Sequence, residues 1–245
     1  MVSNQEGWSR IQDFFRFTRQ EVSGLALAVL VAALIFSFRD WGDTTFSVVK
    51  GVHHFLQIAL IAGLSFGFRV SCQKIYALWS GYTAEFRVWW AGLLLSLLLA
   101  FVTFGRVPLL LIGGITATFM VRQRLGEFRY GFSYWESGII SLWAVYASLI
   151  LAIAFGIGHY LVPETYFFQK GLWLNLIMGL CALVPVPQLE GVNIFFAARW
   201  LLFLALGMVL LEAVLLLTRT LYGVLIPLIL GVIISSVYLL ISSEK

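Results

Sequence analysis

Charged residues are scarce in this sequence: only 11% of the residues are Asp, Glu, Lys or Arg, whereas 61% are hydrophobic. A soluble domain needs a larger polar surface than this composition supplies, so the scarcity of charge excludes a water-soluble globular fold. The 16 Lys and Arg residues form no basic run, which argues against a nucleic-acid partner. The chain is therefore predicted to be an integral membrane protein, with the lipid bilayer as a partner.

Cysteine and histidine are also few. Cys72 and Cys181 lack C-x-x-C spacing and lie among apolar residues, which predicts reduced, buried thiols. His53 and His54 are neighbours, and adjacent helix positions point about 100° apart, so the pair is a poor chelate for a single metal ion. We expect both histidines, and His159, at the membrane interface.

Long hydrophobic runs are abundant instead. A membrane-spanning helix needs about 20 residues, and six to seven spans fit the sequence. The second span begins near His53 and runs through Phe68 into the stretch that carries Arg69 and Gln73; the others are expected at approximately 22–38, 88–104, 138–162, 166–184, 199–218 and 221–242. The preceding residues 1–20 mix charge with aromatic side chains, which is typical of an amphipathic interfacial segment. We predict a mostly α polytopic membrane protein in which residues 21–245 form a single membrane domain.

One region has the pattern of β structure. In PLLLIGGITATFMV (108–121), two apolar, partly β-branched runs flank Gly113-Gly114, which is typical of a β-hairpin. A lipid-exposed sheet edge is not stable at membrane depth, because its backbone groups would lack partners. We therefore predict a small interfacial or re-entrant β-hairpin or sheet.

Two segments place polar residues inside the predicted spans. RVSCQK puts Arg69 and Gln73 where the second span should still be apolar. In ALVPVPQLEGVNIFF (182–196), prolines precede Glu190, and a proline interrupts a helix because it lacks a backbone donor. A broken helix followed by an acid is a common form of intramembrane site. An ordinary helix end with an interfacial glutamate is the alternative.

The second of these segments resembles the N-x-x-P-x-P-x-L-D-G motif of the site-2 protease family, the intramembrane zinc metalloproteases. In that family the motif Asp is a zinc ligand. Glu190 replaces this Asp, and Ala182 replaces the Asn. The matching residues are Pro185, Pro187, Leu189 and Gly191.

An earlier segment, GYTAEFR (81–87), resembles a stretch that follows the H-E-x-x-H motif in a prokaryotic, mostly archaeal branch of the same family. Counting back from it places that motif on Arg69, Val70 and Gln73. A third family landmark, G-P-x-x-N, retains only Gly138. The resemblance implies a site-2-protease-like core over about 50–200, followed by two extra spans within 199–242.

The residues at the family-equivalent positions do not suit zinc chemistry. Arg69 carries a fixed charge and no available lone pair, the amide oxygen of Gln73 is a poor zinc ligand, and Val70 cannot transfer a proton. A catalytic zinc ion needs three protein ligands and an open position, and Glu190 alone does not supply them. We expect no catalytic residue, no zinc and no other cofactor.

A guanidinium instead takes the place of the metal in this interpretation. We predict that Arg69 and Glu190 form a buried ion pair and that Gln73, one turn along, forms a hydrogen bond to it. The pocket around them is expected to include Gln73, Pro185, Pro187 and Gly191. There are two alternatives: Arg69 snorkels to the membrane interface, or it pairs with the carboxylate of a ligand.

These expectations define a catalytically inactive relative of the family in the cell membrane of a prokaryote. It would act as a scaffold or regulator that binds a membrane protein or a transmembrane segment. The family's edge strand for substrates implies a partner strand at Gly113, Gly114, Ile115 and Thr116. An active intramembrane zinc metalloprotease with unrecognised ligands is one alternative. A small transporter or channel that uses Arg69, Glu190 and the intramembrane acid Glu212 is another.

Overall fold

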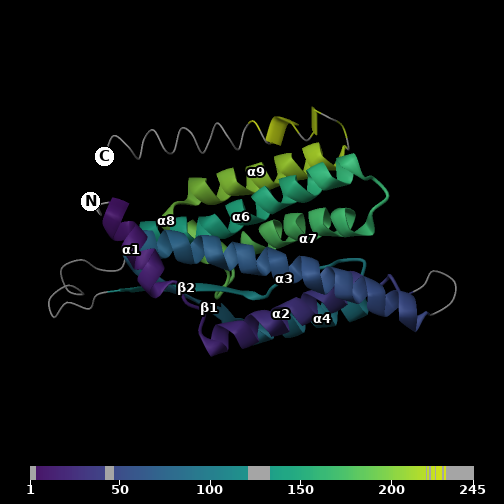
Figure 1. Cartoon of the computed structure of the whole chain (residues 1–245), viewed down its shortest axis with the longest axis horizontal. Helices are drawn as coiled ribbons and strands as arrows, with labels where there is room; N and C mark the ends of the chain where they lie inside the picture. Colours follow the sequence, from purple (N-terminus) through teal and green to yellow (C-terminus); the bar gives the residue numbers. More distant parts are fainter. Residues whose placement is uncertain are drawn as a thin grey trace.

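The computed structural model describes residues 4–41, 47–120, 133–218, 220, 222, 223, 225–227 and 229. Over these residues the chain is mostly helical, with one small sheet (Figure 1). Four helices are long and apolar enough to cross a membrane, as expected of a membrane protein. They are α2 (Arg19–Ser37), α3 (Val48–Trp79), α6 (Tyr134–Leu161) and α9 (Arg199–Leu217).

The described residues thus contain fewer spans than the six to seven that the sequence predicts. The expected third and fifth spans form α4 (Trp90–Val102) and α7 (Tyr166–Ala182), with 13 and 17 residues. Both helices are shorter than the length of about 20 residues that crosses the hydrocarbon layer. The expected span at 221–242 lies mostly outside the described residues.

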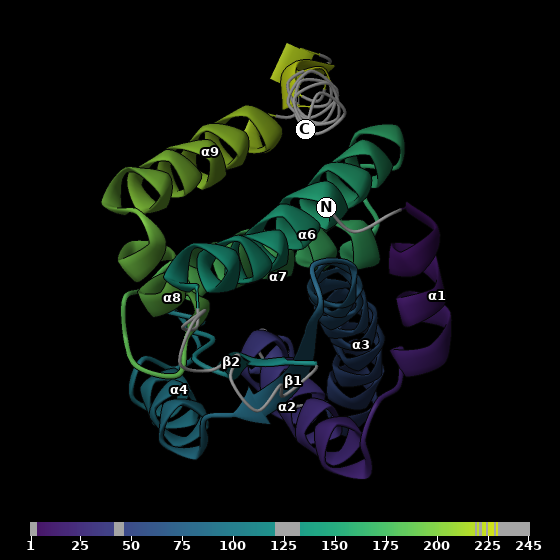
Figure 2. The same cartoon turned by 90° about the vertical axis from the view of Figure 1, so that its left-hand side faces the viewer.

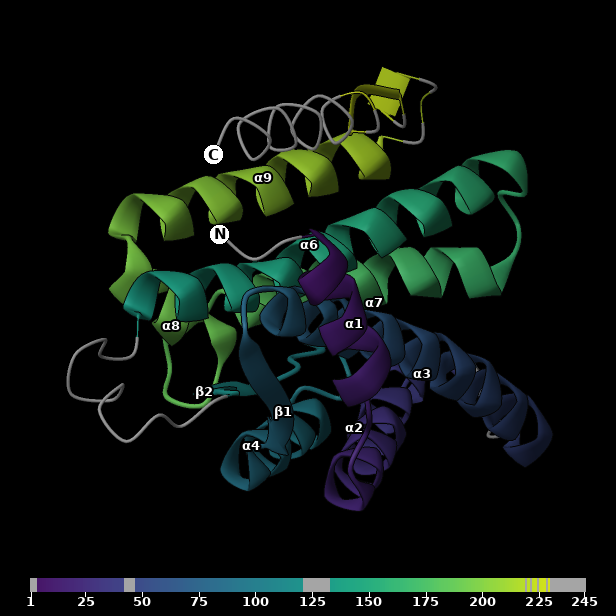
Figure 3. The ribbon, with the colours of Figure 1, turned by 60° about the vertical axis from the view of Figure 1, so that its left-hand side comes forward.

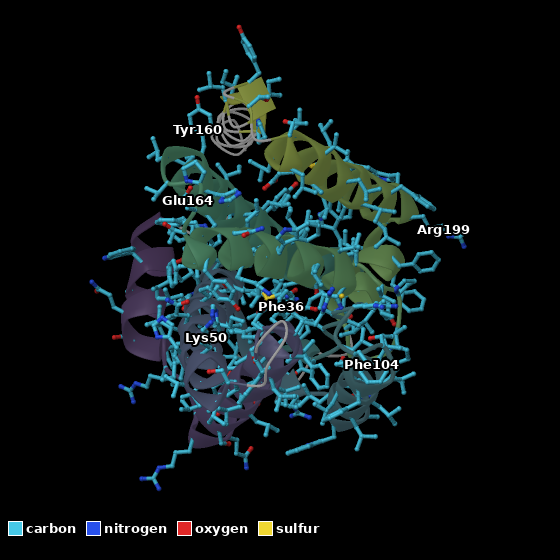
Figure 4. The ribbon with its side chains drawn as sticks, turned by 90° about the vertical axis from the view of Figure 1, so that its right-hand side faces the viewer. Phe36, Lys50, Phe104, Tyr160, Glu164 and Arg199 are labelled. Atoms are coloured by element: carbon cyan, nitrogen blue, oxygen red, sulfur yellow. The ribbon has the colours of Figure 1, made fainter. Side chains whose placement is uncertain are left out.

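The helices form two groups, which Figure 2 shows one above the other. One group contains α6, α7, α9 and the short helix α8 (Glu190–Ala197), and the other contains α2, α3, α4 and the sheet. The long helix α3 packs against α2 as well as against α6 and α7, so it joins the two groups. Side chains at the junction are buried: Phe36 lies inside the molecule, whereas the exposed Arg199 points away from it (Figure 4).

The amino-terminal helix α1 (Asn4–Phe14) lies beside α3 (Figure 2). A Cβ atom at Gly7 would lie 2.9 Å from the indole ring of Trp79, so the absence of a side chain lets α1 approach the end of α3. Trp8 and Phe14 remain exposed on α1. The interfacial position of residues 1–20 stays a prediction.

The sheet consists of β1 (Tyr82–Val88) and β2 (Gly113–Phe119), which pair antiparallel with Tyr82 opposite Phe119 and Val88 opposite Gly113. Figure 3 shows it below the layer of α6 and α7 and next to α4. The predicted small sheet is confirmed, but the hairpin turn predicted at Gly113-Gly114 is wrong, because residues 108–112 form no strand. Gly113 instead begins β2 at a φ of 137°, where a Cβ atom would lie only 2.2 Å from the carbonyl oxygen of Arg87.

One face of this sheet is polar. Glu85 and Arg87 are exposed, and their charged atoms lie 4.0 Å apart. On the same face the hydroxyl groups of Thr83 and Thr118 are 2.8 Å apart, forming a cross-strand hydrogen bond. Charged and hydroxyl groups of this kind need water or polar partners, so this face of the sheet does not lie against lipid hydrocarbon.

The edge of β1 that faces away from β2 is bound by a buried carboxylate. Glu21, which is 2% exposed, closes a capping box with Thr18 at the start of α2. Its Oε2 accepts hydrogen bonds from the backbone N–H of Thr18 and from Nζ of Lys74, both at 2.8 Å. Its Oε1 accepts from the backbone N–H of Phe86 at 2.9 Å, on the side of β1 that faces away from β2. This single side chain therefore connects α2, α3 and β1.

The partner of Glu21 is satisfied as well. Nζ of Lys74 also donates to the carbonyl oxygen of Arg16 at 2.8 Å and lies 4.5 Å from the centre of the Phe17 ring. A buried ion pair is compatible with a stable fold when the remaining donors and acceptors have partners, as they have here. The roles of Glu21 and Lys74 were not predicted from the sequence, although the Thr18-x-x-Glu21 spacing of a capping box is a visible signal.

A second cluster joins the helices some way from the sheet. Asp40 Oδ2 accepts from the hydroxyl of Tyr166 at 2.5 Å and from Nζ of Lys170 at 2.6 Å, which ties the end of α2 to the start of α7. The His54 ring lies 4.1 Å from that of Tyr166. Burial and the carboxylate of Asp40 raise the pKa of Tyr166 above its usual range, so its phenol stays protonated and donates.

We predict that Glu21→Gln or Lys74→Met alone lowers the free energy of unfolding by about 3–5 kcal/mol, because each leaves an uncompensated buried partner. The double variant should lose less than the sum of the two single losses. Unfolding in detergent, followed by circular dichroism, measures these differences.

Arg87→Ala is the matched control, since it removes an exposed ion pair that should contribute little. Equal effects of Arg87→Ala and Glu21→Gln would contradict an anchoring role for the buried pair.

Candidate functional site

The structure places Arg69 of α3 against Glu190 of α8. Nη2 of Arg69 lies 2.7 Å from Oε1 of Glu190, and the two side chains are 8% and 2% exposed. The distance is short, as charge-assisted hydrogen bonds are. Arg69 is thus buried between helices and does not reach an exposed interface, which was the snorkelling alternative.

The local sequence explains how Glu190 arrives there. Helix α7 ends at Ala182, the segment 183–189 carries both prolines, and α8 starts at Glu190. The carboxylate therefore stands at a helix N-terminus, where the helix dipole favours negative charge. Gly191 lets the chain fold back tightly, since a Cβ atom there would lie 2.5 Å from the carbonyl oxygens of Leu183 and Val184.

Two further glycines allow neighbouring elements to approach α8. A Cβ atom at Gly138 of α6 would lie 2.2 Å from Cβ of Ala197. A Cβ atom at Gly114 of β2 would lie 2.9 Å from the carbonyl oxygen of Gln188 and 3.5 Å from Cδ of Glu190. The glycine that remains of the third landmark thus has a packing role. Together these contacts hold α8 against α6 and place Glu190 next to β2.

Gln73 is close by but does not bind the pair as predicted. Its Nε2 donates to the carbonyl oxygen of Ile140 at 3.4 Å, because this face of α3 turns toward α6. Helix α8 is joined to α6 by a separate hydrogen bond, from Nδ2 of Asn193 to Oγ of Ser141 at 3.0 Å. The expected hydrogen bond between Gln73 and the ion pair is therefore replaced by a helix–helix contact.

A small cavity of about 10 Å³ adjoins the ion pair. Arg69, Val70, Gln73, Gly113 and Glu190 contribute to its lining, so the structure brings together all three positions of the H-E-x-x-H resemblance.

The other predicted pocket residues do not line this cavity. Pro185 and Pro187 are exposed, because the turn after α7 carries them outward, and Gly191 packs under the preceding backbone. Of the predicted strand residues, Ile115 is buried and Thr116 is exposed.

The side chains at this site are not suited to bind zinc. Arg69 has N–H groups but no lone pair for a metal, Val70 is apolar, and Gln73 offers a neutral amide oxygen. Three protein ligands and an open position, as a catalytic zinc ion requires, are not available there. Over the described ranges of the chain, no group of three or more His, Cys, Asp or Glu side chains lies close enough to hold a metal ion.

Other polar residues of the spans lie elsewhere. His53 is 16 positions before Arg69 on the same helix, which separates them by roughly 24 Å. Glu212 is 7% exposed on α9 and does not line the cavity. It lies between Val209, which neighbours Gly179, and Leu216, which neighbours Gly156, so it faces the seam of α6 and α7.

Comparison with known proteins gives one informative similarity. Over 182 residues, the chain is 28% identical to a protein of Methanocaldococcus jannaschii described as a "putative zinc metalloprotease". The similarity covers 72% of this chain and 84% of that protein. No family model matches the chain. No solved structure matches it either. The similarity supports a relation to site-2-protease-like metalloproteases.

We predict that Arg69→Met or Glu190→Gln alone destabilises the protein by about 3–5 kcal/mol, whereas the double variant costs less than the sum. An unpaired arginine at the centre of a span costs about 2.5–3.5 kcal/mol on insertion scales, and the pair offsets part of this cost. A double-mutant cycle on unfolding in detergent measures the coupling. Additive effects would show that the contact does not stabilise the fold.

Proposed function

We propose that this protein is a non-catalytic relative of the intramembrane metalloproteases, and that it binds a segment of another membrane protein as a scaffold or regulator. The observation that carries the proposal is the Arg69–Glu190 contact of 2.7 Å. A guanidinium occupies the place where the related proteins would need a metal ligand, and it neutralises the acid that remains. The chemistry of peptide hydrolysis has no metal-activated water to use in such a site.

The geometry of the sheet supports a binding role. In the β1–β2 register, the backbone groups of Ile115 and Ala117 point away from β1, since Phe86 and Ala84 opposite them also point outward. Neither Ile115 nor Ala117 forms an outward backbone hydrogen bond with any residue that the structure describes. An open strand edge of this kind is suited to bind an extended segment through its backbone.

The other edge of the sheet is closed. Glu21 accepts from the backbone N–H of Phe86, and Val88 packs against Gly24 of α2. A partner strand is therefore expected on β2 and not on β1. The polar outer face of the sheet places this edge where an unpaired, hydrated segment can reach it.

We predict that the purified protein contains no stoichiometric zinc, because its donor set lacks three suitable ligands. The variant R69H/V70E/Q73H/E190D, which restores the ligands that the resemblance implies, should gain about one zinc ion per chain. Elemental analysis after dialysis against a weak chelator measures both.

The variant V70E alone is the control, since it adds a carboxylate without the histidines. One tightly bound zinc ion in the unmodified protein, lost on Glu190→Gln, would favour the active metalloprotease alternative.

We also predict that a photo-crosslinking residue at Ala117 captures a discrete membrane-protein adduct in native membranes, and that one at Ala84 does not. The two alanines lie opposite each other in the register, on the same face of the sheet, but on its open and closed edges. Ala117→Pro, which removes an outward N–H that β1 does not use, should abolish adducts formed from Phe119. Equal yields from Ala84 and Ala117 would contradict binding at the β2 edge.

A further inference from the structure

Two hydrogen-bond acceptors at the cavity beside the ion pair have no partner among the described residues. They are Oε2 of Glu190 and Oε1 of Gln73, which are both buried. The two residues are 1% and 0% exposed, and both line the same cavity. Buried polar atoms are nearly always paired, so two free acceptors at one place indicate a donor that comes from outside the chain.

Two donors that border the cavity are directed to other acceptors. Arg69 directs Nη2 to the other carboxylate oxygen, Oε1 of Glu190. The amide of Gln73 directs Nε2 to the carbonyl oxygen of Ile140. The free oxygens thus belong to groups whose orientation is fixed by other contacts, which makes them a prepared recognition point.

The charge of the site selects a neutral donor. Arg69 and Glu190 cancel each other at a distance of 2.7 Å. An ammonium group placed in the cavity would lie next to the guanidinium without a carboxylate of its own, and burial of an uncompensated charge is costly. A hydroxyl group can donate to either free oxygen without adding charge.

The size and walls of the cavity restrict the ligand further. A volume of about 10 Å³ has room for a group the size of a water molecule. The apolar part of its lining includes Phe66, Val70, Leu110, Ile112 and Leu189. A single hydroxyl group fits this volume, whereas the end of a long or charged side chain does not.

The cavity also adjoins the edge at which a partner strand would bind. Gly113 is both part of the cavity lining and the first residue of β2. Gly114, the next residue of β2, lies against Glu190, since a Cβ atom there would lie 3.5 Å from Cδ of Glu190. The cavity and the strand edge are therefore neighbours.

We propose that the cavity is a specificity subsite for serine or threonine: the hydroxyl of one such residue, in an extended segment along the outer edge of β2, donates to Glu190 Oε2 or Gln73 Oε1. This inference rests on the proposed function and adds the chemical class of the recognised residue. An ordered water molecule in the cavity is the competing occupant.

The test uses synthetic peptides with one apolar span and an extended tail of alternating Val and Ala, in nanodiscs that contain the full-length protein. Serine is placed at each tail position in turn, and affinity is measured by fluorescence anisotropy. Serine at one position should strengthen binding about tenfold over alanine, as one satisfied buried hydrogen bond allows. Serine at the two adjacent positions should have no effect, because neighbouring side chains of a strand point to opposite faces.

Gln73→Leu should bring the serine peptide down toward the affinity of the alanine peptide. Gln57→Leu is the matched control, because Gln57 is another glutamine of α3 with a free side-chain oxygen, and it lies outside the cavity lining. This control should keep the preference for serine. A lysine at the same tail position should bind more weakly than alanine.

The outcomes separate the inference from the proposed function. If the peptides bind and Ala117→Pro abolishes binding, but serine and alanine are equal at every position, the cavity holds a water only and the inference is wrong. A serine preference that persists in Gln73→Leu and in Glu190→Gln also overturns it. If no peptide binds the unmodified protein, the proposed function fails and the inference fails with it.

Discussion

A buried guanidinium in a membrane protein imposes a constraint that the rest of the fold must meet. Arg69 lies within a helix of 32 residues, where its charge can neither be lost nor reach water without distorting the chain. Glu190 meets the constraint from the first residue of α8, after α7 has ended at Ala182. The turn after α7, the glycines next to α8 and the strand β2 all pack around this carboxylate.

A second ionic contact on the same helix supports the other side of the site. Lys74 is five positions after Arg69, and it holds Glu21, which in turn holds the backbone of β1. Helix α3 therefore carries two buried cations, one directed to α8 and one to α2. Arg69 thus holds α8 and Lys74 holds α2 next to α3. The strand β2 contacts α3, α6 and α8.

The similarity to a described metalloprotease favours a zinc site, whereas the side chains of the site do not suit zinc. The similarity covers 72% of this chain, whereas the side chains of Arg69, Val70 and Gln73 are not suited to bind zinc. Arg69 balances the charge of Glu190 at a distance of 2.7 Å, so the buried pair is electrically neutral. A neutral buried site of this kind is compatible with the binding role proposed above.

The sequence by itself determined the features that depend on local pattern. The apolar runs predicted the helices that became α2, α6 and α9, the prolines predicted the break before Glu190, and the chemistry of Arg69 excluded it as a zinc ligand. These conclusions need only hydropathy, backbone chemistry and the identity of one side chain. The short α4 and α7 show the limit of this reasoning, since an apolar run does not state where the helix stops.

Only the tertiary structure decided the contacts between distant segments. Gly113-Gly114 has the local pattern of a hairpin turn, yet β2 pairs with a strand some 30 residues earlier, because the chain brings β1 to it between helices. Glu21 has the local pattern of a capping residue, but its partner Lys74 comes from the next helix. Gln73 turns to Ile140 for the same reason: a side chain takes the partner that packing presents, and packing is not local in the sequence.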